Sequence, residues 1–269
     1  MFVVITGSTK GIGLALAEHF LSSGDHVLIS SRSSDSIDVL VTRLSKIYPD
    51  MIIGKTCDVT NYISVADLAT FAIIKWGKID IWVNNAGINL DYDDLVNVPP
   101  DNIERTVKTN IVGTLFGCKV ALKIMQKQGY GRLFNMAGLG SSGRLSPKLA
   151  TYGTTKRSIP YLSQTLAEEN NGTNIGIHTI SPGMVITDLI IPHVTSENAN
   201  IFNILCEKPD VVANFLVPRM RKITGTAKQI NYLTRRKVIW RFITSRKRKN
   251  RFFNDEGNKI DDLKDRHIV

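Results

Sequence analysis

Two side chains with complementary acid–base chemistry, Tyr152 and Lys156, lie four residues apart in the segment ATYGTTKRS. Residues four apart share one face of an α-helix, so the phenol and the ammonium can enter the same site. A free tyrosine has a pKa of about 10, and a neighbouring positive charge lowers that pKa because it stabilises the phenolate. The pair therefore predicts an active site in which the tyrosine hydroxyl exchanges a proton with a reacting group.

The chain around this pair alternates between short apolar runs and segments with helical periodicity. Runs such as FVVIT, IDIWVNNAG and IGIHTISPG are typical of buried parallel strands. Between them we expect helices, including one long helix from about Asp101 to Gln128 and one from Thr151 to about Glu169. The alternation predicts an α/β fold: a doubly wound parallel sheet with helices on both faces, in a single domain over residues 1–269 with a basic C-terminal extension.

A glycine-rich loop with the sequence TGSTKGIG lies between the first predicted strand and the first predicted helix. Glycines let backbone N–H groups approach a pyrophosphate, and the helix that follows presents its positive N-terminus to the same anion. The loop therefore predicts dinucleotide binding, and the expected contacts are Gly7, Ser8, Lys10, Gly11, Ile12 and Gly13.

The end of the second predicted strand indicates which dinucleotide binds. An acidic residue there would accept hydrogen bonds from the ribose hydroxyls of NAD, but this chain has the sequence SSRS, with Arg32 at its third position. Arg32 and Lys10, together with these hydroxyls, suit a 2′-phosphate. We therefore expect the cofactor to be NADP(H); the alternative is that both cations are only solvated.

Five motifs in the same order and spacing resemble those of the short-chain dehydrogenase/reductase family, over residues 1–190: TGSTKGIG, CDVT, NNAG, YGTTK and Pro182-Gly183. The resemblance implies a nicotinamide-dependent oxidoreductase without a metal. It implies that Asn110 positions a water in a proton relay and that Lys156 contacts the nicotinamide ribose. The further cofactor contacts that it implies are Asp58, Val59, Asn85, Ala86, Gly87, Tyr152, Pro182, Gly183 and Thr187.

The family's substrate-polarising serine is missing from its usual place. That serine lies about thirteen residues before the tyrosine, where this chain has Leu139. Ser141 and Ser142 follow in a glycine-rich loop that could bring either hydroxyl to the substrate. We predict Ser141 as the catalytic serine beside Asn110, Tyr152 and Lys156, with Ser142 as the second candidate and no polarising serine as the third possibility.

The segment FNMAGLGSSG, followed by TYGTTK, is similar to FNMDGAGSGG and YGSTK of plant chlorophyll(ide) b reductases, with Ala137 in place of the Asp. Similarity continues in ISPGMVITDLI, FNILCEKPDVVANFLVPRMR, INYLT and RFFNDEG. The resemblance implies NADPH-dependent reduction of the formyl group of chlorophyll(ide) b to give 7-hydroxymethyl chlorophyll(ide) a, and a homodimer or homotetramer. Two alternatives remain open: a generic reductase of 3-oxoacyl thioesters or small ketones, and a non-catalytic NADP-binding sensor.

Two segments near the C-terminus suggest a substrate and a surface partner for the protein. Residues 184–206, where the family places a mobile substrate lid, contain the apolar run MVITDLIIPHV, which suits a large hydrophobic substrate; simple packing of that run onto the body is the alternative.

Residues 211–254 carry thirteen Lys or Arg and no Asp or Glu, in a chain of net charge +10. We expect this basic segment to contact a membrane surface or an acidic protein, or else to be a solvated surface; no nucleic-acid-reading motif accompanies it. No run of eighteen apolar residues occurs. We therefore expect a cytoplasmic protein, peripheral at a membrane (a photosynthetic one in a phototroph) if the basic segment binds there.

Overall fold

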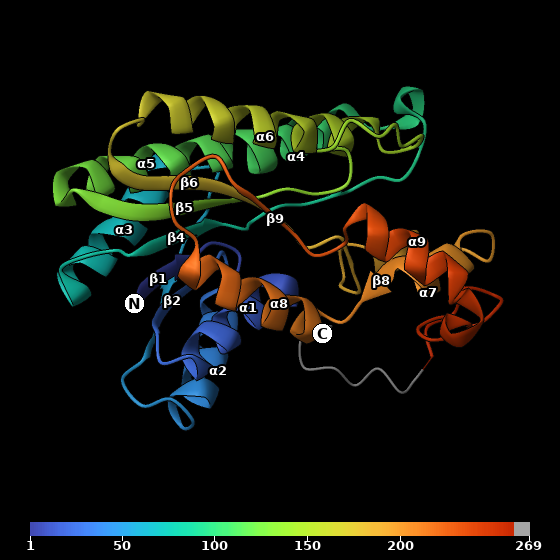
Figure 1. The fold of residues 1–269 in the computed structure, drawn as a ribbon, viewed down its shortest axis with the longest axis horizontal. Coiled ribbons are helices and arrows are strands. Elements are labelled where there is room, and N and C mark those ends of the chain that lie inside the picture. The colour runs from blue at the N-terminus through green and yellow to red at the C-terminus, as the bar shows by residue number, and fades with distance from the viewer. Residues whose placement is uncertain (261–269) are drawn as a thin grey trace.

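The computed structural model describes residues 1–260 as a parallel sheet between two layers of helices (Figure 1). The sheet has seven strands in the order β3-β2-β1-β4-β5-β6-β9, and all neighbouring strands are parallel. Their bounds are β1 Phe2–Ile5, β2 His26–Ser31, β3 Ile52–Thr56, β4 Ile81–Asn84, β5 Tyr130–Met136, β6 Asn174–Ser181 and β9 Gln229–Asn231. The predicted doubly wound α/β fold is confirmed. Of the predicted domain, residues 261–269 lie outside the described residues.

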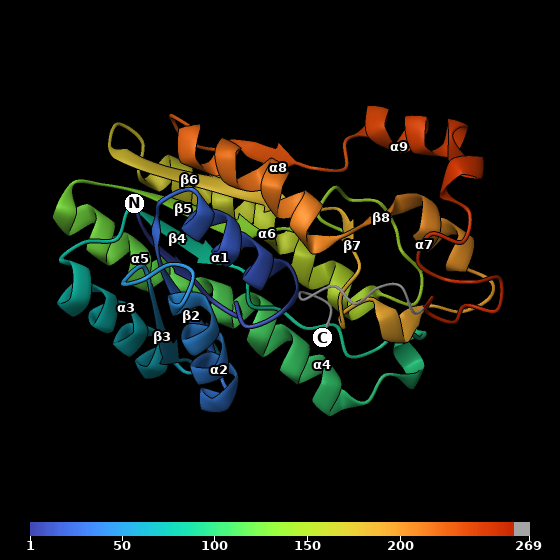
Figure 2. The same ribbon diagram turned by 90° about the horizontal axis from the view of Figure 1, so that it is seen from below.

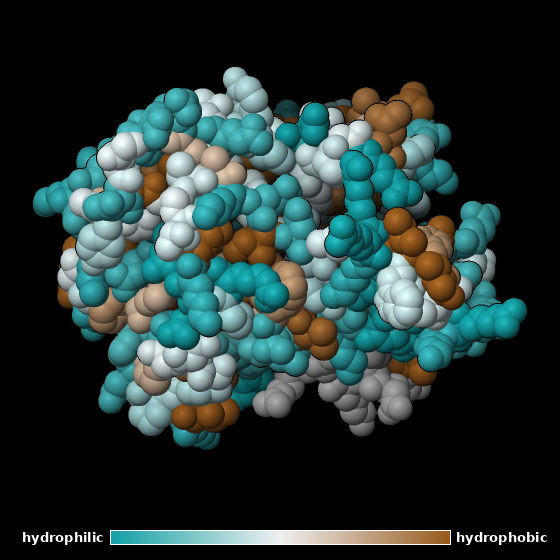
Figure 3. Space-filling model, viewed as in Figure 1, coloured by the Kyte–Doolittle hydropathy of each residue, from teal (hydrophilic) through white to brown (hydrophobic). Residues whose placement is uncertain are grey.

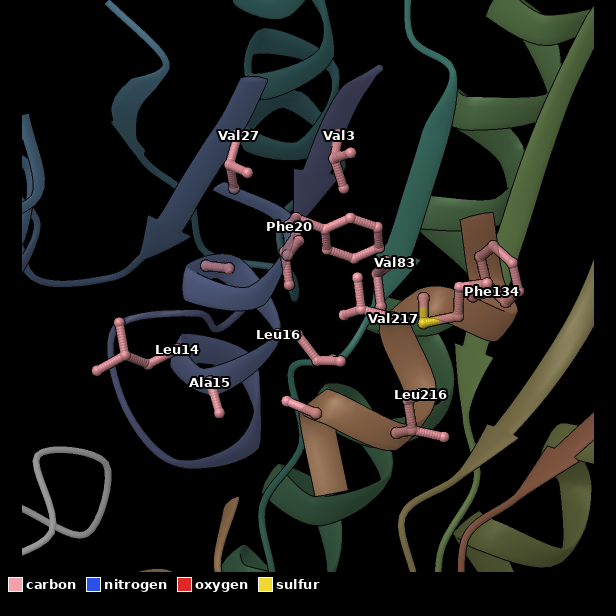
Figure 4. Packing of buried hydrophobic residues seen from close by; sticks show 14 of the residues in the cluster. Val3, Leu14, Ala15, Leu16, Phe20, Val27, Val83, Phe134, Leu216 and Val217 are labelled. Carbon is pink, nitrogen blue, oxygen red and sulfur yellow. The ribbon is translucent and has the colours of Figure 1, made fainter. Parts of the chain in front are cut away.

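One face of the sheet is covered by α1 (Gly11–Ser22), α2 (Ser34–Ser45) and α8 (Pro209–Lys222). Alternate strand residues such as Val3, Val27 and Phe134 point to this face and are fully buried (Figure 4). Phe20 of α1 and Leu216 of α8 complete the cluster. Since burial of a large apolar side chain contributes about 1.5–3 kcal/mol, this cluster fixes the first strand and first helix, and with them the loop that joins them.

The opposite face is covered by α3 (Tyr62–Trp76), α4 (Pro100–Val107), α5 (Gly113–Gln128) and α6 (Ala150–Glu169). The expected single helix from Asp101 to Gln128 is instead α4 and α5 joined by a π-helical turn over Lys108–Val112. The extra residue of a π turn shifts the side chains that follow, and such turns are frequent at functional sites. Here the turn contains Asn110, which is buried.

The remaining elements gather at one end of the molecule, away from α3, in both ribbon views (Figures 1 and 2). They are β7 (Met184–Val185), α7 (Ala199–Leu205), β8 (Cys206–Glu207) and α9 (Arg235–Ile243), and β7 pairs with β8 in a second, two-stranded sheet. Short 3₁₀ turns occur at Leu95–Asn97, Ile191–His193 and Ser245–Arg248. A small apolar cluster holds this end together: Ile186, Ala199, Cys206, Phe252 and Phe253. The segment expected to be a substrate lid contributes three of these five residues.

Part of the basic C-terminal segment is structural. Glu207 accepts a hydrogen bond of 2.6 Å from Arg241 and one of 3.2 Å from the Tyr232 hydroxyl, and Arg251 also donates to it. Arg248 lies 3.7 Å from the same carboxylate. Arg241 is only 4% exposed. These arginines therefore anchor the segment to β8 and are not all free to meet a partner. Among residues 1–260 no helix is long and apolar enough to span a bilayer.

Candidate active site

Tyr152 and Lys156 lie in the first two turns of α6 and line a cleft of about 740 Å³ at the carboxyl ends of the sheet strands. Lys156 Nζ is 5.8 Å from the centre of the Tyr152 ring and donates a hydrogen bond of 3.1 Å to the Met136 carbonyl at the end of β5. A Cβ atom on Gly138 would lie 2.7 Å from the Tyr152 hydroxyl oxygen. Only glycine therefore fits beside the phenol, and the predicted pair does share one site.

Burial sets the proton affinity of both groups. It raises the pKa of Tyr152 to about 12, which is the opposite of the lowering expected from the lysine alone. It also lowers the pKa of Lys156 to about 8, and the side chain is only 5% exposed. Because each charged form loses hydration in the buried site, the tyrosine holds its proton at neutral pH. The phenol is therefore set to donate a proton, as carbonyl reduction requires.

These pKa values predict the pH dependence of the reduction. Tyr152 stays protonated far above neutral pH, so the group that titrates first is Lys156, which loses its positive charge above pH 8 or so. Since the ammonium stabilises the tyrosinate that forms as the proton leaves, kcat/KM for reduction should be flat below this pH and fall above it. A pH–rate profile in the reductive direction measures this, and a rate that climbs through pH 8 contradicts it.

Asn110 connects the helices of the site to the loop after β4. Its side-chain oxygen accepts a hydrogen bond of 2.8 Å from the Ile88 amide, and its side-chain nitrogen donates to the Ile88 carbonyl and to the Thr155 hydroxyl. Thr155 in turn donates to the Tyr152 carbonyl at 2.7 Å. This chain of bonds positions the turn of α6 that carries Tyr152. The water-positioning role implied by the family resemblance stays a prediction.

The predicted serine is not brought to the cleft. Ser141 is buried, its amide closes a turn onto the Gly138 carbonyl at 3.0 Å, and its own carbonyl accepts a bond of 3.1 Å from Arg157. These two bonds hold the loop against α6, so that Leu139 lines the cleft while Ser141 and Ser142 do not. In this structure neither Ser141 nor Ser142, which is exposed, lines the cleft, and a polarising role for either serine stays a prediction.

Replacing Ser141 with alanine should consequently change kcat by less than about tenfold, equivalent to less than about 1.4 kcal/mol of transition-state stabilisation. A side chain away from the cleft cannot stabilise charge on the substrate oxygen. Steady-state kinetics with the purified variant measure the effect. A loss of several hundredfold would show that the loop rearranges and brings this hydroxyl to the substrate.

The glycine loop fits closely around the end of β4. Gly7 has φ +61°, and a Cβ atom there would lie 2.8 Å from Ala86 Cα. A Cβ atom on Gly13 would lie 2.5 Å from both Asn85 Nδ2 and the Gly7 carbonyl oxygen. Asn85 also donates hydrogen bonds to the Thr6 and Gly7 carbonyls, at 2.9 and 2.7 Å. Since side chains are excluded here, the backbone at the start of α1 stays open to a phosphate group.

Every predicted cofactor residue except Ser8 lines the same cleft: Gly7, Lys10, Gly11, Ile12, Gly13, Arg32, Asp58, Val59, Asn85, Ala86, Gly87, Tyr152, Lys156, Pro182, Gly183 and Thr187. Ser8 is fully buried. Its hydroxyl donates to the Ile5 carbonyl at 2.7 Å and accepts from the Ser30 amide at 3.0 Å. It therefore binds β1 to β2 in this structure, and its contact with the cofactor stays a prediction.

The end of the cleft beside β2 carries hydroxyls and cations. Ser31, Arg32, Ser33 and Ser36 line it, and α2 begins there with Ser33 as its N-cap. Lys10 lies on the same cleft, but its ammonium pairs with Asp188 at 2.5 Å. The sequence alone gave no signal for this pair, which joins the glycine loop to the predicted lid. In this structure Arg32 is the cation available to a 2′-phosphate.

Comparison with known proteins shows to which family the chain belongs. A family model described as short chain dehydrogenase matches residues 1–198, which is most of the chain. The chain belongs to the short-chain dehydrogenase family. Members of this family are NAD(P)-dependent oxidoreductases. Within residues 1–260 no group of three or more His, Cys, Asp or Glu side chains could hold a metal.

Among curated relatives, this short-chain dehydrogenase is 39% identical to a probable chlorophyll(ide) b reductase of Arabidopsis thaliana, over 96% of this chain and 55% of that protein. It is 41% identical to a chlorophyll(ide) b reductase of Oryza sativa subsp. japonica, over 94% of this chain and 74% of that protein. Both relatives are named chloroplastic. The chain spans about half the length of the first of these relatives.

Solved structures agree on the fold. ElxO with NADP bound is 28% identical and superposes with a TM-score of 0.77 over 86% of this chain and 96% of that chain. The closed form of serine dehydrogenase complexed with NADP⁺ is 21% identical, with a TM-score of 0.76 over 86% of this chain and 94% of that chain. Two structural neighbours of this dehydrogenase thus contain NADP.

The other end of the dehydrogenase cleft is apolar and is built largely by loops. Tyr92 and His193 lie there with their ring centres 5.8 Å apart, and burial lowers the pKa of His193 below its usual value, so the imidazole is neutral. The apolar side chains that line this end are Leu90, Leu139, Leu149, Leu189, Ile190 and Phe202. Sequence reasoning missed Tyr92 and Leu149, which carry no motif, whereas Phe202 lies in the segment predicted as the substrate lid.

Proposed function

We propose that this dehydrogenase uses NADPH to reduce a formyl group on a large hydrophobic substrate, and that the substrate is chlorophyll(ide) b. The observation that carries the proposal is the identity of 39–41% to chlorophyll(ide) b reductases over 94–96% of the chain. That span includes the C-terminal region beyond residue 198, where the family model ends. The apolar end of the cleft supports the same substrate class, since hydrophobic ligands are bound in concave, mostly apolar sites.

The residues of the chain act on the carbonyl oxygen. NADPH, when bound, supplies a hydride to the carbonyl carbon. The Tyr152 hydroxyl donates its proton to the carbonyl oxygen, so that the formyl group becomes a hydroxymethyl group. Lys156 faces the tyrosine with a positive charge and stabilises the phenolate that remains. Gly138 lets the substrate and the phenol approach without a side chain between them.

Preference for NADPH over NADH is part of the proposal and depends on Arg32. A hydrogen-bonded charge pair with a phosphate contributes about 1.5–3 kcal/mol, so Arg32→Ala should weaken NADPH binding by about 10- to 100-fold. NADH lacks the 2′-phosphate, so its binding should be unchanged, which makes it the internal control. Titration of each nucleotide by calorimetry measures both. Equal losses for the two nucleotides would show that Arg32 does not recognise the 2′-phosphate.

The substrate is tested with purified protein, NADPH and chlorophyllide b. We expect the absorption spectrum to change from that of chlorophyllide b to that of the 7-hydroxymethyl product, with one NADPH consumed per product. Chlorophyllide a, which has a methyl in place of the formyl group, is the matched control and should consume no NADPH. Turnover of a 3-oxoacyl thioester or a small ketone, with no reaction of chlorophyllide b, would assign the protein to the generic reductases instead.

A further inference from the structure

Helix α9 has its polar side toward the protein and its apolar side toward solvent. Arg241 is 4% exposed and forms an ion pair of 2.6 Å with Glu207, so this helix is attached to the body through a buried charge pair. Four large apolar side chains are exposed instead: Ile239 at 61%, Trp240 at 64%, Phe242 at 47% and Ile243 at 70%. We call these four residues the apolar face of α9.

The four side chains form one continuous surface. In an α-helix successive residues are about 100° apart, since a turn takes about 3.6 residues. Ile239 and Ile243 are therefore one above the other, with Phe242 on one side of them and Trp240 on the other, while Arg241 lies on the opposite side. Figure 3 shows the hydrophobic colour of this face over α9, surrounded by hydrophilic atoms. An exposed apolar patch of this kind, with a polar rim, marks an interaction surface.

The charges at both ends of the apolar face are positive. Arg235 and Arg236 begin α9, and Arg246 and Lys247 follow its last turn; all four are exposed. None of the four is in an ion pair within residues 1–260. No Asp or Glu occurs anywhere from residue 211 to residue 254. The partner of this face must therefore offer an apolar layer next to negative charge.

We propose that α9 docks on an anionic lipid bilayer, with its apolar face in the acyl boundary and the four flanking cations at the lipid headgroups. Tryptophan beside arginine and lysine on one helix is the composition of interfacial helices. The helix lies at one end of the molecule in both ribbon views, so a flat surface can reach it (Figures 1 and 2). A second copy of the chain fits poorly, because it would bring cations against cations with no acidic residue of the segment to pair with them.

Docking also has a consequence for the substrate cleft. Phe202 of α7 lines the cleft, and Arg241 of α9 donates a hydrogen bond of 2.6 Å to the carbonyl of Leu205, the last residue of α7. A bilayer held by α9 would thus lie near the apolar end of the cleft. The lipid contact itself does not depend on the proposed function, since binding to vesicles is measured without any substrate.

The experiment is flotation of the full chain with vesicles of phosphatidylcholine containing phosphatidylglycerol, compared with vesicles of phosphatidylcholine alone. We expect binding to the anionic vesicles only, and weaker binding as salt is added. Of the three tryptophans, Trp240 is exposed, Trp76 is partly buried and Trp82 is fully buried. The tryptophan emission should therefore shift to the blue on binding, and Trp240→Phe should abolish the shift while flotation persists.

Two matched pairs of variants separate the contribution of the apolar side chains from that of the cations. Trp240→Ser with Ile243→Ser should reduce partitioning by more than about tenfold, whereas Ile63→Ser with Ile74→Ser, exposed on α3, should not change it. Arg246→Gln with Lys247→Gln should reduce it by about tenfold or more, since each cation near an anionic surface contributes roughly fivefold. Lys123→Gln with Lys127→Gln on α5 is the control for charge.

Three outcomes overturn the proposal. The first is no flotation with anionic vesicles, or equal flotation with neutral ones. The second is full binding by the Trp240→Ser, Ile243→Ser variant with its circular dichroism unchanged. The third is self-association without lipid, seen by sedimentation velocity and abolished by that same variant, which would make a second copy the occupant. Capture on polyglutamate that competes with vesicles would assign the face to an acidic protein.

Discussion

Replacing Tyr152 with phenylalanine is expected to lower kcat for carbonyl reduction by about 10²- to 10⁴-fold, the usual contribution of a positioned general acid. The phenol has a pKa of about 12 in this site and is the proposed proton donor beside Lys156. Phenylalanine keeps the ring and the packing against Gly138 but has no proton to give. NADPH binding should stay within about tenfold of the wild-type value. Stopped-flow measurement of NADPH consumption gives kcat, and nucleotide titration gives the binding constant.

Tyr161 provides the control for this substitution. It lies on the same helix, α6, but is exposed, so Tyr161→Phe should leave kcat unchanged. A Tyr152→Phe variant with wild-type turnover would show that another group supplies the proton. A wild-type protein that binds NADPH and turns over no carbonyl substrate, with its phenol intact, would instead support the non-catalytic sensor.

Replacing Glu207 with glutamine is expected to lower the free energy of unfolding by about 3–5 kcal/mol, the usual cost of removing one partner from a buried ion pair. The carboxylate is the shared acceptor of Arg241 and Arg251 and lies within 3.7 Å of Arg248. Without its charge, three cations would lie together at the attachment of α9 with nothing to compensate them. The midpoint of urea unfolding measures the change.

The pKa of Glu207 indicates the pH range in which its ion pairs stabilise the fold. Burial alone would raise that pKa, but the hydrogen bond and charge of Arg251, with the charges of Arg241 and Arg248, lower it overall. A carboxyl with a lowered folded-state pKa stabilises the fold above its ordinary value of 4.5 and loses that contribution as the pH falls through the lowered value.

Glu104→Gln is the matched control, because Glu104 pairs with Lys108 on the surface; its effect should be below about 1 kcal/mol. A loss of that size for Glu207→Gln as well would mean that the arginines are held by their carbonyl contacts alone.

The fold and the catalytic pair could be predicted from the sequence because their signals are local. Four-residue spacing places Tyr152 and Lys156 on one helix face, and the glycine loop follows the first strand directly. Alternating strands and helices leave few topologies, so these local signals also determine where the cleft lies. The position of the loop at the switch point between β1 and β4 follows from the strand order.

Two predicted site residues lie away from the cleft because the course of the backbone determines where their side chains point. Ser8 has the right place in the loop, but its hydroxyl bonds to Ile5 and Ser30 and so faces the sheet. Ser141 is only two residues from Leu139, yet a turn closed by Gly138 separates the two, and only Leu139 lines the cleft. Glycine spacing showed that the loop could turn, but not in which direction.

The anchoring of the basic segment could not be predicted for a different reason. Its sequence shows only many cations and no acids, whereas in the structure Arg241 and Arg251 bind Glu207, a residue 34 and 44 positions earlier in the chain. Sequence patterns on a single helix cannot show a partner so distant. Because Arg241 faces the interior, the neighbouring side chains on the other side of α9 point outward, and these are the residues of its apolar face.

The central claim is that this cleft reduces a formyl carbon, with Tyr152 as the proton donor. The most direct test is turnover of chlorophyllide b with NADPH that carries deuterium at the transferable position of the nicotinamide. We predict one deuterium in the hydroxymethyl group of the product by mass spectrometry, and no labelled product from Tyr152→Phe above about 1% of the wild-type rate. Unlabelled product, or full labelling by the variant at the wild-type rate, would contradict the account.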